Sequence, residues 1–178
     1  MIIFVNGAFG VGKTTVAELL VQNIPDSLLY DPEIVGMGLR YIVQPIVTFD
    51  DFQDLPPWRP LVVETARQLL KTYERTLIVP MTLWNTAYFL EIMDGLRTFE
   101  PQLFHFCLTA TESTLLKRLE NRPSSPQAFA WCCERIERCV TAFQDDMFAE
   151  QLITDDRTPE ELVAEILSRV SMNADVEQ

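Results

Sequence analysis

The chain has 178 residues, 48% of them hydrophobic, and a formal net charge of -12. This length fits one domain with a substantial core, and the composition excludes a disordered chain. The acidic charge argues against nucleic acid or anionic lipid as a partner, because their phosphates would be repelled over most of the surface. A local basic site for a small anionic ligand remains compatible with this charge.

The cysteines and the first residues give two further expectations. Cys107, Cys132, Cys133 and Cys139 form no C-x-x-C pair and lack zinc-ligand spacing, so we expect reduced thiols without a metal. The amino-terminal segment has no basic region, and its apolar run is shorter than a signal peptide or a membrane span requires. We therefore expect a cytoplasmic protein.

Short apolar runs alternate with segments of helical periodicity along the chain. Strands are predicted over 1–5, 28–30, 76–81, 103–109 and 151–154, and helices over 13–24, 61–73, 86–99, 112–122, 125–147 and from 159 onward. A helical or irregular stretch is expected over 33–43 and a loop over 50–60. Capping boxes are expected at Thr109 with Glu112 and at Thr158 with Glu161.

This alternation predicts an α/β fold of three layers, with a five-stranded parallel sheet covered by helices on both faces. Right-handed crossovers would bring the carboxyl ends of the strands to one edge, where ligands bind. We expect a single domain over residues 1–171, with a small helical lid at approximately 118–138. The acidic tail, 172–178, is predicted to fray.

The segment after the first strand matches the phosphate-binding motif G-x-x-x-x-G-K-[ST]. Its glycines let the backbone wrap around a phosphate, and the following helix directs its amino-terminal dipole at the same anion. Lys13 supplies a charge for the β- and γ-phosphates, and the Thr14 hydroxyl is placed to hold Mg²⁺. The predicted nucleotide-binding residues are Gly7, Ala8, Phe9, Gly10, Val11, Gly12, Lys13, Thr14 and Thr15. The motif predicts a nucleoside triphosphate site in a fold of the P-loop, nucleoside-kinase type.

Candidate acceptor residues follow the second strand and the next loop. Asp31 and Glu33 would emerge at the same sheet edge as the phosphate loop, where a carboxylate could orient an acceptor hydroxyl. Asp31 could equally be a helix cap before a proline, and Arg40 could clamp an anionic acceptor or merely lie on a solvated helix face. Trp58 and Arg59 could form a lid or platform, or the tryptophan could pin the loop from the core.

The few arginines of this acidic chain are informative. Arg118 and Arg122 lie four residues apart on one helix, and Arg135 and Arg138 lie three apart on the next. Both pairs could converge over the triphosphate and neutralise charge in the transition state. The alternative is a set of salt bridges with nearby glutamates.

The strand over 76–81 is followed by Thr82 instead of an aspartate that would hold the metal ion. This argues against a motor or GTPase and favours a small-molecule kinase, in which Thr14, water and the phosphates hold Mg²⁺. No guanine-reading N-K-x-D motif is present, so we expect ATP. The loop after the last strand lies where an adenine could rest.

Several blocks resemble, in order along almost the whole chain, the tunicamycin-resistance ATP-binding family. They cover residues 5–14, 30–33, 38–40, 50–59, 77–82 and 115–119. The phosphate loop is shared by many proteins, whereas the YDPE block and the DDFQ…WR block are specific to this family. More distantly, the layout is similar to chloramphenicol phosphotransferase and to shikimate and gluconate kinases.

The resemblance implies transfer of the γ-phosphoryl group of MgATP to a hydroxyl of tunicamycin or another nucleoside or sugar compound. Asp31 would then lie at the acceptor hydroxyl, and Arg118 and Arg122 would grip the phosphates beside Lys13. The implied substrate-binding set is Asp31, Glu33, Arg40, Trp58, Arg59, Thr82, Arg135 and Arg138.

Two alternatives stay open at this point. One is a protein that sequesters the drug in an ATP-dependent manner without chemistry, and the other is a housekeeping metabolite kinase. The founding type of the family is thought to meet the membrane through a carboxy-terminal amphipathic segment. Because lysine and arginine are sparse in this acidic chain, we expect no stable membrane attachment.

Overall fold

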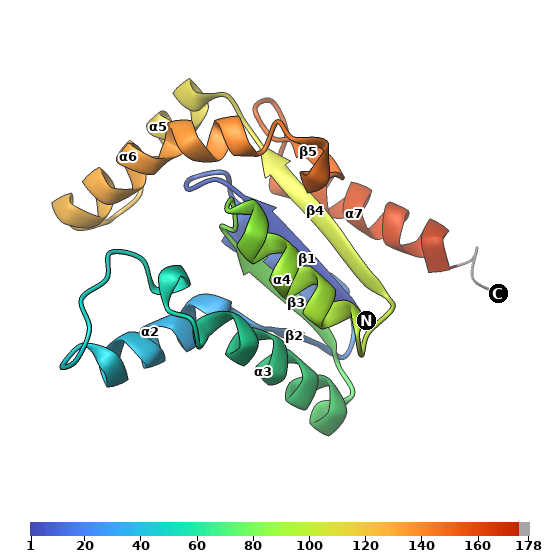
Figure 1. The fold of residues 1–178 in the computed structure, drawn as a ribbon. Helices are drawn as coiled ribbons and strands as arrows, with labels where there is room; N and C mark the ends of the chain where they lie inside the picture. Colours follow the sequence, from blue (N-terminus) through green and yellow to red (C-terminus); the bar gives the residue numbers. More distant parts are fainter. Residues whose placement is uncertain (175–178) are drawn as a thin grey trace.

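The computed structural model describes residues 1–174 and contains one five-stranded parallel sheet (Figure 1). Its strands are β1 (Ile2–Gly7), β2 (Ser27–Leu29), β3 (Thr76–Met81), β4 (Leu103–Thr109) and β5 (Gln151–Ile153), in the order β2-β3-β1-β4-β5. Every neighbouring pair is parallel, so the carboxyl ends of all five strands point to one edge. The predicted sheet is confirmed.

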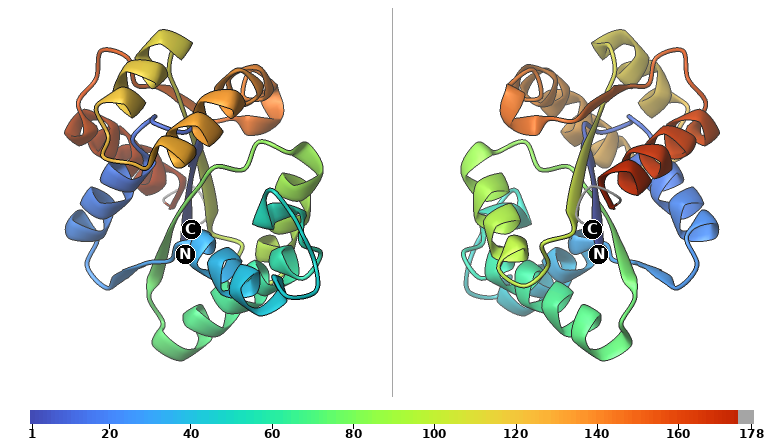
Figure 2. Two further views of the ribbon diagram at one scale, coloured as in Figure 1. Left: turned by 90° about the vertical axis from the view of Figure 1, so that its left-hand side faces the viewer. Right: turned by 90° about the vertical axis from the view of Figure 1, so that its right-hand side faces the viewer.

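Seven α-helices of the described residues surround this sheet. The helices are α1 (Lys13–Asn23), α2 (Pro32–Val43), α3 (Trp58–Tyr73), α4 (Thr86–Arg97), α5 (Glu112–Glu120), α6 (Pro126–Ala142) and α7 (Pro159–Ala174). Figure 2 shows α1 and α7 on one face of the sheet and α2, α3 and α4 on the other, which confirms the three layers. Helices α5 and α6 pack on each other at the end of the sheet where the phosphate-binding loop emerges.

Helix starts follow side-chain caps. Thr158 and Glu161 form the predicted capping box: the Thr158 N–H donates to the Glu161 carboxylate at 2.8 Å, and the Glu161 N–H donates to the Thr158 hydroxyl at 3.2 Å. At α5 the prediction is wrong by two residues. Thr109 ends strand β4, and Thr111 is the cap that accepts from the Thr114 N–H.

Several predicted boundaries differ from the structure. The segment expected to be helical or irregular over 33–43 is a regular helix, and α3 begins at Trp58, three residues early. The helix predicted over 125–147 ends at Ala142, and a separate 3-10 turn, η2 (Asp146–Phe148), follows it. Helix α7 continues through Ala174 into the tail predicted to fray, and residues 175–178 lie outside the described part.

Strand β1 occupies the centre of the sheet and is completely buried, as its apolar run predicts. It pairs with β3 on one side and β4 on the other, so Asn6 lies opposite Met81 and Cys107. The phosphate-binding loop therefore leaves from the middle of the carboxyl edge. Within residues 1–174, none of the helices combines the length and the apolar character needed to cross a bilayer.

Candidate functional site

The loop between β1 and α1 has the backbone of a phosphate cradle. Gly7, Gly10 and Gly12 adopt φ angles of 145°, 81° and 104°, a region that residues with a Cβ rarely occupy. A Cβ at Gly7 would lie 2.5 Å from the carbonyl oxygen of Leu108, so this turn is too close to β4 for any side chain. Gly12 is the N-cap of α1 and offers no side-chain cap, which leaves the first N–H groups of the helix for an anion.

Lys13 begins helix α1 and reaches back across the loop. Its Nζ donates to the carbonyl oxygen of Ala8 at 2.9 Å. Burial lowers the pKa of Lys13 to about 8, and the negative charge of Glu33 acts in the opposite direction. A polyanion bound in the loop would raise the pKa of Lys13 further, as the charge of Glu33 does. Phosphate binding and the charged form of Lys13 therefore favour each other.

The loop opens into a cavity of about 510 Å³, a size that suits a small-molecule ligand. Three arginines line it together with the loop: two come from α5 and the turn after it, and one from the segment between β5 and α7. The lining residues are Gly10, Val11, Gly12, Lys13, Thr14, Thr15, Val16, Arg118, Arg122, Thr154, Arg157, Pro159 and Leu162. In a protein of net charge -12, this concentration of positive charge marks an anion site.

Arg118 joins the phosphate loop to the end of β5. One guanidinium nitrogen, Nη1, donates to the Thr154 hydroxyl at 2.9 Å and to the Val11 carbonyl oxygen at 3.2 Å, and Nη2 donates to the Thr154 carbonyl oxygen at 2.8 Å. These bonds fix the guanidinium plane at the cavity wall. Helix α5 ends at Glu120, two residues before the predicted end, and Arg122 lies in the turn that follows and lines the same cavity.

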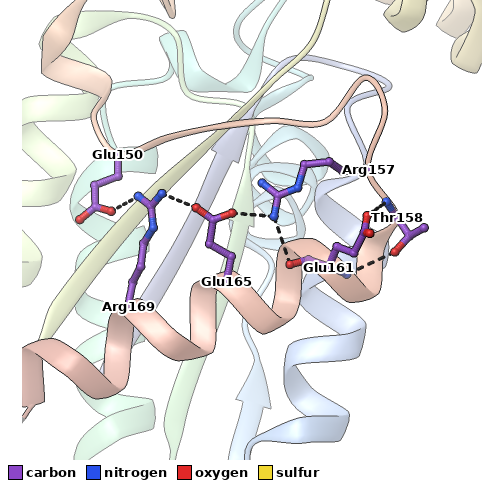
Figure 3. Close-up of polar contacts among 6 residues, drawn as sticks. All are labelled: Glu150, Arg157, Thr158, Glu161, Glu165 and Arg169. Atoms are coloured by element: carbon purple, nitrogen blue, oxygen red, sulfur yellow. Dashed lines mark hydrogen bonds and ion pairs between the residues drawn. The ribbon is translucent and has the colours of Figure 1, made fainter.

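Arg157 is held in the cavity wall by a row of charges on α7 (Figure 3). Its guanidinium lies 2.6 Å from the Glu165 carboxylate and donates to the Glu161 carbonyl oxygen at 3.2 Å. Arg169 binds Glu165 from the other side and also pairs with Glu150. Burial alone would raise the pKa of Glu165, but the hydrogen bonds from the two arginines outweigh it and lower that pKa. Glu165 is therefore a charged anchor for Arg157.

Asp31 and Glu33 lie at the start of α2. The Asp31 carboxylate accepts from the Glu33 N–H at 2.9 Å, so the capping role that the sequence suggested is present. Partial desolvation and the charge of Asp31 raise the pKa of Glu33, while Lys13 and Arg122 act to lower it. The charge of Glu33 is therefore coupled to the positive charges of the phosphate site.

The family-specific segment 50–59 is largely a structural brace. Gln53 is buried, and its amide donates to the Thr82 carbonyl oxygen at 3.0 Å, which ties the loop to the end of β3. Phe52 packs over Gly36, where a Cβ would meet its ring at 2.3 Å. The first turn, η1 (Phe52–Asp54), is capped by Asp51, which accepts from the Gln53 N–H at 3.0 Å.

Trp58 is buried in the core, as one of the two alternatives expected, and Arg59 is bonded to neighbouring residues. The Trp58 side chain is fully buried, and its indole N–H donates to the Pro32 carbonyl oxygen at 3.2 Å. Arg59 donates to the Glu91 carboxylate at 2.5 Å and to the Gln53 carbonyl oxygen at 2.8 Å. The expectation of ligand contact is corrected for Trp58, since a side chain without exposed surface cannot contact an acceptor. Arg59 is engaged in holding the brace.

A second cavity of about 370 Å³ separates the loop after α2 from helix α6. It is lined by Arg40, Asp50, Asp51, Phe52, Gln127, Ala128, Trp131 and Cys132. Trp131 also packs edge-on against Phe9 of the phosphate loop, with ring centroids 5.3 Å apart. The contact between Trp131 and Phe9 thus connects the wall of the second cavity to the phosphate loop.

The two arginines of α6 separate instead of converging on the triphosphate. Arg135 stacks over Trp131, with its guanidinium carbon 4.0 Å from the ring centroid, and forms an ion pair with Asp50 across the second cavity. Arg138 is exposed and lines neither cavity. The expectation that both pairs meet over the phosphates is therefore corrected: of these four arginines, only Arg118 and Arg122 line that cavity.

The residues around the loop suit a magnesium ion held with the phosphates. Thr14 is exposed at the start of α1, where its hydroxyl can reach a metal. Thr82 is buried at the end of β3, and its hydroxyl has no hydrogen-bond partner within residues 1–174. A buried hydroxyl without a partner beside this loop fits a site for metal-bound water, because Mg²⁺ prefers oxygen ligands and retains waters.

Three contributors to the site escape the sequence motifs. Asn6 is a fully buried polar residue within an apolar strand, and that contrast is a signal that could have found it. Trp131 lies four residues before Arg135, which was predicted to bind substrate, and this helical spacing is a signal that suggests their contact. Arg157 follows the last strand in a segment noted only as a resting place for adenine.

The fold and the site together define the chain as a P-loop, kinase-like α/β protein that binds a nucleotide. A model of the family described as AAA domain matches residues 2–144. The chain belongs to this family.

Solved structures support the same class. The tunicamycin resistance protein of Deinococcus radiodurans has 26% sequence identity and a TM-score of 0.78, covering 96% of this chain and 95% of that protein. A gluconokinase from Sinorhizobium meliloti 1021 has 19% identity and a TM-score of 0.65, with 97% and 93% covered. The shikimate kinase of Aquifex aeolicus has 20% identity and a TM-score of 0.50, with 98% of each chain covered. The resemblance inferred from the motifs is confirmed, and a search among curated proteins gives no match.

Proposed function

We propose that the protein transfers the γ-phosphoryl group of MgATP to a hydroxyl of a small molecule, with tunicamycin or a related nucleoside or sugar compound as the acceptor. The observation that carries the proposal is the joint lining of one cavity by the phosphate loop, Arg118, Arg122 and Arg157. The charges of Glu33 and Lys13 influence each other's pKa, and Asp31 caps the helix that carries Glu33, which supports a reaction space shared with these carboxylates.

In the proposed reaction the bond between the γ-phosphorus and the β,γ-bridging oxygen breaks while a bond from the acceptor oxygen forms. Asp31 accepts the proton of the acceptor hydroxyl, and ADP leaves. Lys13, Arg118 and Arg122 stabilise the charge on the phosphoryl oxygens. Mg²⁺, when bound through Thr14 and water, neutralises further charge on the phosphates.

Incubation of the protein with MgATP and tunicamycin, followed by mass spectrometry of the drug, tests this proposal. We expect a mass increase of one phosphate group, lost in Asp31→Asn and retained in Asp26→Asn, a carboxylate outside both cavities. An unmodified drug that co-purifies with the protein in the presence of MgATP would favour sequestration instead.

That second function has one specific point in its favour. The Asp31 carboxylate already accepts a backbone hydrogen bond as the cap of α2, and a capping carboxylate can hold a sugar hydroxyl without accepting its proton. If tunicamycin neither reacts nor binds, a thermal-shift screen with MgATP and a panel of metabolites identifies another acceptor, because a true ligand raises the melting temperature by mass action.

A further inference from the structure

A third cavity, of about 500 Å³, lies between the ends of strands β4 and β5 and the helices α5 and α6. It has nearly the volume of the nucleotide cavity, which is enough for a small organic molecule. Each of the four elements contributes an apolar side chain to its lining: Leu108 in β4, Leu115 in α5, Val140 in α6 and Ile153 in β5. The proposed phosphoryl transfer makes no use of this cavity.

The charged part of the lining is acidic. Glu112 and Asp155 line the third cavity, and its lining within residues 1–174 contains no lysine or arginine. Hydrogen bonds from Thr111 lower the pKa of Asp155, so this carboxylate is charged at neutral pH. Glu112 is exposed and takes part in none of the ion pairs found among the described residues.

These two carboxylates decide which ligand charge the third cavity favours. Both lie at the start of α5, where the helix dipole supplies a positive charge of about half a unit. Two full negative charges exceed that dipole, so the mouth of the cavity stays negative. It would repel an anion and attract a cation, while the apolar walls favour a ligand with an apolar body.

The third cavity and the nucleotide cavity share a wall formed by α5 and the segment after β5. On the nucleotide side, Arg118 of α5 binds the hydroxyl and the carbonyl oxygen of Thr154. On the other side, Asp155 accepts from the Thr111 hydroxyl at 2.6 Å and from the Thr114 hydroxyl at 2.7 Å. A molecule in the third cavity therefore contacts the helix that carries Arg118.

We propose that the third cavity is an effector site for a small organic cation, a protonated amine attached to an apolar body such as an aromatic ring. The ammonium group lies against Glu112 and Asp155, and the apolar body packs on Leu115, Val140 and Phe143. The bound cation holds α5 against the segment after β5. This keeps Arg118 in the wall of the nucleotide cavity and strengthens MgATP binding.

Three indoles of similar size test the ligand class. At neutral pH tryptamine is a cation, tryptophol is uncharged and indole-3-propionate is an anion. Each is titrated by calorimetry into the full chain, without nucleotide and with saturating MgADP. We expect tryptamine to bind at least about threefold more tightly than tryptophol, as a partly exposed ion pair allows, and the anion to bind most weakly. MgADP should not displace tryptamine, because the two cavities are separate.

Two substitutions at exposed positions test the location. Glu112→Gln keeps the size of the side chain and should reduce the advantage of tryptamine over tryptophol by at least half. Glu120→Gln is the matched control, because this exposed carboxylate lies at the other end of α5 and outside the third cavity. Gln144→Trp adds a large side chain at the edge of the cavity and should weaken the binding of tryptamine and tryptophol alike. Circular dichroism checks that all three variants are folded.

Titration of MgATP with and without saturating tryptamine tests the coupling. We expect tryptamine to lower the dissociation constant of MgATP about fivefold, at the low end of common allosteric couplings. By linkage, MgATP should raise the affinity for tryptamine by the same factor. In Gln144→Trp the same tryptamine concentration should change MgATP binding much less.

Three results would overturn the effector site. They are a wild type that gives no saturable heat with tryptamine, a preference for the cation that is absent or survives in Glu112→Gln, and an MgATP affinity that tryptamine leaves unchanged or weakens. Each leaves the proposed function standing if MgATP binds and phosphoryl transfer is seen. A wild type that binds no MgATP would remove the proposed function and the coupling together, whereas the titrations without nucleotide would still decide whether the third cavity binds the cation.

Discussion

The side chain of Asn6 binds both backbone polar groups of Leu83. Its Nδ2 donates to the Leu83 carbonyl oxygen at 3.0 Å, and its Oδ1 accepts from the Leu83 N–H at 2.9 Å. The same oxygen accepts from the Gly7 N–H at 2.9 Å. One buried amide thus joins the first residue of the phosphate loop to the segment after β3, so the position of the loop depends on a contact between distant parts of the chain.

Replacing Asn6 with alanine should lower the free energy of unfolding by about 2–4 kcal/mol, because three buried backbone groups lose their partner. Urea denaturation measures this loss. Asn23→Ala is the control: its amide donates to the Leu19 carbonyl oxygen on an exposed helix surface, and its loss should cost less than about 0.5 kcal/mol. Equal effects of the two substitutions would contradict the bridging role of Asn6.

Gly36 and Gly38 both lie in helix α2 but should respond oppositely to alanine. A Cβ at Gly36 would meet the Phe52 ring at 2.3 Å, whereas nothing lies within 4 Å of a Cβ at Gly38. We expect Gly36→Ala to destabilise the protein by about 1–3 kcal/mol. Gly38→Ala should stabilise it by up to about 1 kcal/mol through helix propensity. Thermal unfolding of both variants measures these changes in stability. A Gly36→Ala protein as stable as the wild type would contradict the prediction and would show that Phe52 and segment 50–59 move to make room for the methyl group.

Glu165 should matter for nucleotide binding although it does not line the nucleotide cavity. Neutralising it in Glu165→Gln removes the charged anchor of Arg157, and we expect the dissociation constant of MgATP to rise about three- to tenfold. Titration calorimetry measures the change. Glu160→Gln, an exposed substitution on the same helix, should leave the constant unchanged. A shift shared by both variants would indicate a general charge effect instead of positioning.

The buried side chain of His105 should make the stability of the protein depend on pH. Burial lowers its pKa to about 4, against an ordinary value of 6.5, although Nδ1 lies 2.8 Å from the Ala149 carbonyl oxygen. Between pH 4 and pH 6.5, His105 binds a proton in the unfolded chain but not in the folded protein. The free energy of unfolding should therefore fall as pH decreases from about 6.5 toward 4. We expect a loss of about 1–2 kcal/mol from pH 7 to pH 5.

The variant His105→Phe isolates this contribution, since the ring lies between Phe4 and Phe89 and an apolar ring can replace it. Denaturation at both pH values should give a smaller difference in the variant than in the wild type. An unchanged difference would assign the pH dependence to other groups, such as Glu165 and Asp155, whose pKa values are also lowered.

The fold was predictable because its signals are local. The apolar run of β1, the glycines of the loop and the box of Thr158 with Glu161 each specify a backbone conformation within a few residues. The failures concern side chains whose direction depends on distant partners. Trp58 belongs to a family-specific block that suggested a ligand site, but nothing in the sequence tells whether that ring points inward.

The candidate site likewise contains a part that the sequence predicts locally and a part that depends on distant partners. The phosphate loop follows from one contiguous motif, whereas the anchoring of Arg157 requires Glu165, a residue eight positions later on a helix behind it. Arg135 was expected beside Arg122 because their helices are consecutive, yet the direction of α6 brings it to Asp50 instead. Such pairings depend on how helices lie in space, which residue spacing within one helix does not specify.

Calorimetric titration of MgATP into the wild type and into Lys13→Ala tests the central claim, that the loop after β1 is a triphosphate site. We predict saturable heat for the wild type and an affinity at least about tenfold weaker for the variant, because a partly buried ammonium that meets the phosphates is lost. Lys117→Ala, which removes an exposed lysine of α5, should bind like the wild type. No heat from the wild type, or equal affinity in Lys13→Ala, would contradict the account.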